Sequence, residues 1–270
     1  MTSATMTRVS DVERRNPVVV AVRDAIAVSE RNLITYRRVP QLLVFSTIQP
    51  VIFVLLFRYV FGGAITVPGG VPYVDFLMPG IFVQTVVFGA LGAAIGLATD
   101  LKSGLLERFR ALPMARSAVL AGRTLADLLR NVFVVALMFA VGVAVGFRVH
   151  TSALDVIIGL LLILLFAYAL SWVFALVGLW VGDPETAQAA AFPILAPLVF
   201  ASSVFVPVSS MPNWLQGWAL HQPVSVVASA VRELMLGPVS VGDVFQAIGW
   251  CLAVLAVFAP LAVWRYRRVA

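Results

Sequence analysis

The feature that most constrains this chain is the recurrence of long apolar runs. A run of about 20 apolar residues crosses a hydrocarbon core of about 30 Å at 1.5 Å per residue, and such runs occur repeatedly along the 270 residues. Hydrophobic residues make up 61% of the chain and charged residues 12%, whereas an average soluble domain has about 25% charged residues. The sequence therefore predicts an all-α membrane protein with several spans.

We expect six transmembrane helices, preceded by a cytoplasmic N-terminal arm (1–38) and followed by a short cytoplasmic tail (265–270). The predicted spans of this transmembrane domain (39–264) lie at about 39–61, 76–99, 124–147, 154–181, 186–206 and 243–264. Before the fifth span, Asp183, Pro184 and Glu185 are typical of an N-cap, a first-turn proline and an acid that compensates the helix dipole.

The distribution of basic residues predicts the orientation of the spans. Of 19 Lys and Arg residues, seven lie in 1–38, six in 100–130 and three in 265–270, which places 16 on one side. Basic residues accumulate on the cytoplasmic side of membrane proteins. We therefore expect a multi-pass protein of the cytoplasmic membrane with both termini inside, and we expect no nucleic-acid partner for this basic charge.

The apolar segment 224–236 is too short, at about 20 Å, to cross the membrane. Together with residues 207–223 it predicts a pair of short re-entrant helices that dip into the outer leaflet. Trp214 and Trp218 would then lie at the interface, where indole rings prefer to be. An ordinary amphipathic external loop is the alternative.

A charged block at residues 101–123 separates the second and third spans. Its apolar side chains recur at helical spacing, its polar side chains fall mainly on the other side, and Pro113 ends the pattern. This predicts a short cytoplasmic amphipathic helix that either docks into a partner protein or lies on anionic lipid head groups. The apolar positions are Leu105, Leu106, Phe109 and Leu112, and the polar ones are Lys102, Ser103, Glu107, Arg108 and Arg110.

Three stretches resemble the type-2 ATP-binding-cassette (ABC) exporter permeases of the daunorubicin-resistance branch. They are GLLERFRALPMARSAVLAGRTLADLLR (104–130), FLMPGIFVQTVVFGALGAAIGLATD (76–100) and PETAQAAAFPILAPLVFASSVFVPVSSMPNWLQGWALHQPVSVVASAVRELMLG (184–237). The resemblance implies six spans, an interfacial amphipathic N-terminal helix, a coupling helix between spans two and three, and short re-entrant helices before span six.

The chain contains no GxxxxGK[ST] phosphate loop. We therefore expect no cofactor in this chain, with ATP and Mg²⁺ held by a separate ATPase subunit. The resemblance favours docking of the charged block: Leu105, Phe109 and Leu112 would fill a cleft in the ATPase, and Glu107, Arg108 and Arg110 would pair at its rim. It also implies two ATPase copies and a second permease, identical or paralogous.

Further polar residues are candidates for coupling or for the substrate path. Arg123, Asp127 and Arg130 share one helix face at i, i+4 and i+7, which predicts an intrahelical ion-pair ladder that orients the coupling helix; the alternative is a proton relay through Asp127. Within the spans, polar side chains either line a translocation path or make packing hydrogen bonds. These are Gln49, Gln84, Ser171, Ser202 and Ser203.

The sequence thus predicts the permease subunit of an ABC exporter that moves an amphipathic drug, antibiotic or lipid-like substrate outward through the lipid bilayer. A proton-coupled drug antiporter is the main alternative. An intramembrane enzyme is a weaker one, because the only histidines, His150 and His221, lie in different predicted loops and no metal-binding motif is present. We expect no catalytic residue.

The predicted topology is directly testable. Single cysteines placed at positions 5, 107 and 268 should react with a membrane-impermeant reagent only from the cytoplasmic side, because all three lie in basic segments. An external signal at any of them would contradict the predicted orientation.

Overall fold

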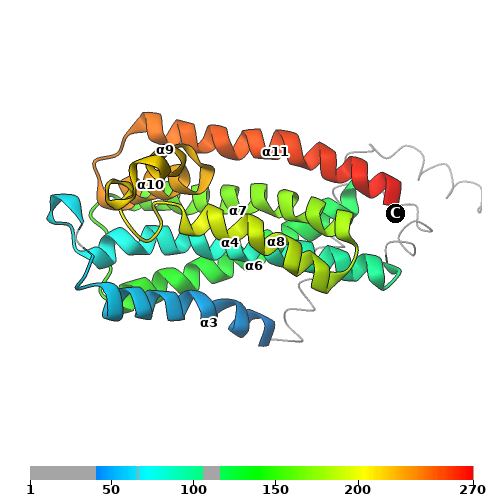
Figure 1. The fold of residues 1–270 in the computed structure, drawn as a ribbon, viewed down its shortest axis with the longest axis horizontal. Coiled ribbons are helices and arrows are strands. Elements are labelled where there is room, and N and C mark those ends of the chain that lie inside the picture. The colour runs from blue at the N-terminus through cyan, green and yellow to red at the C-terminus, as the bar shows by residue number, and fades with distance from the viewer. Residues whose placement is uncertain (1–40, 66, 106–115, 270) are drawn as a thin grey trace, which may run out of the picture.

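The computed structural model describes residues 41–65, 67–105 and 116–269. This part of the chain is helical and contains no strand. Long helices run side by side along one axis, and two short helices lie at the end of the bundle opposite the C-terminus (Figure 1). The predicted all-helical architecture is confirmed for these residues.

The long-axis helices are α3 (Gln41–Leu55), which continues as a π-helix (Leu56–Phe61), α4 (Tyr73–Lys102), α6 (Arg116–Ala144), α7 (Ala153–Val181), α8 (Pro184–Phe200) and α11 (Val241–Val269). The short helices are α9 (Asn213–His221) and α10 (Pro223–Leu236), and short 3-10 turns lie at Pro68–Gly70 and Val208–Ser210. By length and apolar composition, four described helices are able to cross a membrane: α4, α6 from Leu120 onward, α7 and α11.

Helix α8 begins as predicted. The Asp183 side chain accepts a hydrogen bond from the Thr186 backbone N–H, Pro184 occupies the first turn, and Glu185 follows it. These residues satisfy a free N–H group and place an acid at the positive end of the helix dipole.

The end of α8 differs from the predicted span, which ran to residue 206. The chain leaves the helix at Ala201 (φ −94, ψ 40), and the Ser202 hydroxyl donates a hydrogen bond to the carbonyl of Val199. Serine hydroxyls that bond to nearby carbonyls compete with the continuation of a helix. Ser202 and Ser203 therefore lie in the turn that follows α8.

Helix α4 forms the centre of the bundle. It packs against α3, α6, α7, α8 and α10, and side chains such as Leu77, Met78, Ile81 and Phe82 have no exposed surface. In contrast, only 17% of the most apolar 18-residue stretch of α11 is buried. Such an exposed apolar helix is unfavourable in water but suits contact with lipid.

Two glycines allow backbones to approach α4 closely. A methyl group on Gly178 of α7 would stand 2.4 Å from the carbonyl oxygen of Ala94, and one on Gly80 of α4 would stand 2.3 Å from that of Val204. Small residues at such contacts are typical of membrane helix packing. The positions of α7 and of the turn after α8 thus depend on the absence of a side chain.

Substitution of Gly178 tests this dependence. Gly178→Ala should lower the free energy of unfolding by about 1–3 kcal/mol, because the added methyl group forces backbones apart. Gly249→Ala on α11, where nothing lies within 4 Å of the added carbon, is the matched control and should be neutral or slightly stabilising. Thermal unfolding in detergent measures both, and equal melting temperatures for the two variants would contradict the argument.

Candidate functional site

The segment predicted to couple the permease to an ATPase connects α4 to α6. Leu105, which is half-buried, is the only one of the predicted docking residues that the structure describes; Glu107, Arg108, Phe109, Arg110 and Leu112 lie outside the described residues. The ends of α4 and α6 that flank it lie at the same end of the bundle as the α7–α8 turn and the C-terminus (Figure 1).

An ion pair joins the two helices that flank this segment. Nη1 of Arg123 on α6 pairs with Oδ2 of Asp100 in the last turns of α4, and each side chain is 17% exposed. Gly96 makes room for the guanidinium, because a methyl group there would stand 1.5 Å from Nη2 of Arg123. This interhelical pair was not predicted, since helical spacing reveals only partners on the same helix.

Arg130 makes a second polar contact between α6 and α4. Its Nη2 donates a hydrogen bond of 2.6 Å to the carbonyl of Gly89, and a methyl group on Gly92 would stand 2.8 Å from its Nη1. Asp127 is buried on the same helix. The predicted ion-pair ladder through Asp127 stays a prediction. Arg123 and Arg130 both contact α4 at glycines, where α4 has no side chain.

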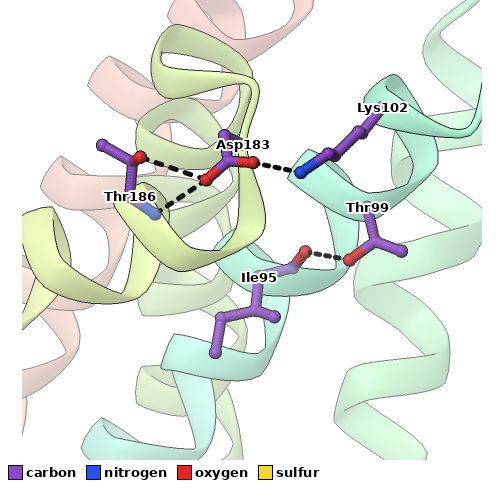
Figure 2. A network of polar contacts seen from close by, with 5 residues as sticks. All are labelled: Ile95, Thr99, Lys102, Asp183 and Thr186. Atoms are coloured by element: carbon purple, nitrogen blue, oxygen red, sulfur yellow. Dashed lines mark hydrogen bonds and ion pairs between the residues drawn. The ribbon is translucent and has the colours of Figure 1, made fainter.

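A third contact ties the end of α4 to the start of α8. Lys102 Nζ lies 2.6 Å from Oδ1 of Asp183. Oδ2 of Asp183 accepts hydrogen bonds of 3.1 Å from the backbone N–H and from the hydroxyl of Thr186, and Figure 2 shows these contacts together. The Lys102 ammonium, together with these Thr186 donors, lowers the pKa of Asp183 to about 2. Asp183 is therefore ionised at neutral pH and both caps α8 and pairs with α4.

At the opposite end of the bundle, a cavity of about 590 Å³ lies between α10, the start of α4 and the loops. Arg232 of α10 lines it and is held in place by two carbonyls: Nε donates to Phe76 (3.0 Å) and Nη2 donates to Ser203 (2.9 Å). Its Cζ lies 3.8 Å from the centre of the Phe76 ring. Sequence reasoning missed this residue, although a lone Arg within the apolar run 224–236 was a usable signal.

The five predicted path residues have different surroundings. Ser203 is the one that lines the cavity. Gln84 is buried on α4, and its Oε1 has no hydrogen-bond partner among the described residues. The hydroxyls of Ser171 and Ser202 donate to backbone carbonyls nearby in the chain, as packing serines do, and Gln49 is exposed on α3. Their roles in a path remain predictions.

Within the described ranges, no three His, Cys, Asp or Glu side chains gather in a group that could hold a metal ion.

The half-buried ion pair of Asp100 and Arg123 should be energetically coupled. Asp100→Asn and Arg123→Gln, combined in a double-mutant cycle, should give a coupling free energy of about 0.5–3 kcal/mol in unfolding. The corresponding cycle for Lys102 and Asp183, whose side chains are 65% and 36% exposed, should give a smaller coupling that falls as salt is added. Additive losses for Asp100 and Arg123 would mean that the pair contributes no net stability.

Comparison with known proteins identifies the family. Residues 23–236 match the model of the ABC-2 type transporter family. The daunorubicin resistance ABC transporter permease protein DrrB1 of Streptomyces coeruleorubidus is 36% identical, with 88% of this chain and 83% of the relative covered. The probable doxorubicin resistance ABC transporter permease protein DrrC of Mycobacterium tuberculosis is 26% identical (83% and 81% covered), and the putative transport permease ycf38 of Cyanophora paradoxa is 24% identical (79% and 74%).

These matches confirm the resemblance seen in the sequence. They also decide against the proton-coupled antiporter and the intramembrane enzyme, because the related proteins are permease subunits of ABC transporters. The chain belongs to the ABC-2 type transporter family and is a membrane-embedded permease subunit of an ABC exporter, with ATP hydrolysed by a separate ATPase partner.

Proposed function

We propose that this permease moves an amphipathic drug, antibiotic or lipid-like substrate outward across the cytoplasmic membrane. Two relatives are named for resistance to daunorubicin or doxorubicin, which supports a drug as the substrate. The proposed transporter contains two ATPase subunits and a second permease, identical or paralogous.

The proposed topology has six spans with both termini in the cytoplasm. Four of the six spans are the long apolar helices α4, α6, α7 and α11. The other two are α3, which continues to Phe61, and α8, both of which run along the same axis (Figure 1). The C-terminal end of α11, which carries Arg265, Arg267 and Arg268, lies at the same end of the bundle as the ends of α4 and α6 that the basic segment connects (Figure 1), which supports a cytoplasmic position for this end. In this arrangement α9 and α10 are re-entrant helices on the outer side.

The observation that carries the proposed mechanism is the set of contacts beside the coupling segment. Arg123 pairs with Asp100 between α6 and α4, and Lys102 pairs with Asp183 between α4 and α8. A push by the ATPase on the segment between α4 and α6 would therefore act on helices that are already linked. In this mechanism the segment docks by Leu105, Phe109 and Leu112, with Glu107, Arg108 and Arg110 at the rim.

Transport by the reconstituted complex tests the function. The chain and its partner ATPase in liposomes should translocate daunorubicin when ATP is added, and the drug should stimulate ATP hydrolysis. A fluorescent phospholipid in place of the drug tests the lipid-like alternative. If neither compound is moved or stimulates hydrolysis, the proposed substrate class is wrong.

Two substitutions in the coupling segment test the mechanism. Phe109→Ala should weaken association with the ATPase by about 2 kcal/mol if it removes an apolar anchor, and Glu107→Arg should weaken it by adding like charge beside Arg108 and Arg110. Phe245→Ala, which truncates an aromatic ring 68% exposed on α11, is the matched control. Co-purification and substrate-stimulated hydrolysis in nanodiscs measure the effect.

The rival interpretation of the segment predicts a different pattern. If it lies on lipid, the Phe109 and Glu107 variants would keep normal ATPase binding and normal export but would lose affinity for anionic liposomes. That result would rule out the docking mechanism while leaving the export function intact.

A further inference from the structure

The cavity beside α10 contains the guanidinium of Arg232, which two hydrogen bonds hold in place and which has further N–H donors. A guanidinium carries five N–H donors. The hydrogen bonds of Arg232 to Phe76 and Ser203 use its Nε and Nη2, and its Nη1 has no hydrogen-bond partner among the described residues. The two carbonyls and the Phe76 ring therefore fix a cation that still has donors to offer.

Arg232 makes no close ion pair, although the neighbouring carboxylate of Glu233 is near enough to act on its charge. Among the described residues, ion pairs within 4.0 Å link Lys102 to Asp183 and Arg123 to Asp100, but none involves Arg232. Glu233 also lines the cavity, and its Oε2 accepts a hydrogen bond of 3.1 Å from the backbone N–H of Ser240. A cation that lines a cavity, has unused N–H donors and makes no ion pair within 4.0 Å favours an anionic ligand.

Other groups around the cavity suit the rest of an amphiphile. Ser229 precedes Arg232 by one turn on α10, its Oγ lies 3.5 Å from the Oγ of Ser203, and His150 contributes an imidazole to the wall. Arginine and hydroxyl groups together are well suited to the several oxygens of a phosphate. The apolar part of the wall is made by Val67, Val71, Pro72, Val208 and Leu236.

Neighbouring tryptophans indicate the depth of the cavity in the membrane. Trp214 and Trp218 on α9 are 81% and 52% exposed, and α9 follows Pro207 and Val208, which line the cavity. Exposed indoles prefer the level of the lipid head groups. A cavity at that level, with a phosphate-binding cation and an apolar wall, has access to phospholipid.

From these observations we infer that the cavity binds the phosphate head group of an anionic phospholipid, with Arg232 and Ser229 on the phosphate and the glycerol and first acyl carbons against the apolar wall. The assignment to the outer leaflet rests on the proposed topology. Lipid binding itself requires neither transport nor the ATPase, so it can be tested separately from the proposed function.

Lipid titration of the purified full-length permease tests the site. Delipidated protein in a neutral detergent is titrated with phosphatidylglycerol, and bound lipid is counted by native mass spectrometry. Val71→Asp, which places an acid on an exposed loop of the cavity wall, should weaken the tightest binding about tenfold, because the new carboxylate repels the phosphate. Arg232→Lys should weaken it similarly, provided that its thermal unfolding matches the wild type.

The control removes a basic charge at the same end of the bundle but outside the cavity. Arg148 is exposed and does not line the cavity, so Arg148→Gln should bind phosphatidylglycerol like the wild type. Phosphatidylcholine, whose head group has no net charge, should bind more weakly than phosphatidylglycerol to the wild type. Equal binding by wild type and Val71→Asp, or an equal loss in Arg148→Gln, would overturn the proposal.

Competition distinguishes the source of the phosphate. Glycerol 3-phosphate at the concentration of the lipid should not displace phosphatidylglycerol, because it lacks the acyl carbons that contact the wall. If it does displace the lipid, the site takes a soluble phosphate compound and the lipid assignment is wrong. Displacement by daunorubicin at equal concentration would assign the cavity to an exported drug and would equally overturn the lipid proposal.

Discussion

The arrangement of this bundle depends on how closely the neighbouring helices approach α4. Apolar helices gain little by leaving lipid for one another, so their association depends on close packing and on polar contacts. Along α4, the carbonyl of Ala94 faces Gly178 of α7, Gly80 faces the carbonyl of Val204, and Gly96 lies beneath the guanidinium of Arg123. A single methyl group would block the two backbone contacts at Gly178 and Gly80, whereas at Gly96 it would displace the Arg123 side chain.

The arginines of α6 show how charge is accommodated at such close distances. A cation in an apolar setting is costly unless it is paired or reaches water. Arg123 pairs with Asp100, and Arg130 donates a hydrogen bond to the backbone carbonyl of Gly89. Both arginines lie against glycines of α4, Arg123 against Gly96 and Arg130 against Gly92. The positions of these two charged side chains therefore depend on the absence of side chains on that face of α4.

The sequence predicted the features that are local to one helix. Hydropathy located the long helices, and the N-cap of α8 followed from Asp183 and Pro184, because capping involves residues a few positions apart. The partner of Arg123 could not be predicted in this way, since Asp100 is 23 positions away and their contact depends on the register of α6 against α4. The contacts of Arg232 with Phe76 and Ser203 likewise depend on where α10 packs, which no periodicity in the sequence reveals.

Helices α4 and α8, which run in opposite directions (Figure 1), are linked at both ends by cations. Near the coupling segment the link is the Lys102–Asp183 pair, which is largely exposed and therefore weak. At the other end, Arg232 donates to the carbonyls of Phe76 at the start of α4 and of Ser203 just after α8.

Hydrogen bonds to charged groups contribute about 1.5–3 kcal/mol, whereas exposed ion pairs contribute about 0–1 kcal/mol. Of these two links, we therefore expect the hydrogen bonds of Arg232 to hold α4 and the turn after α8 together more firmly than the Lys102–Asp183 pair holds α4 and α8.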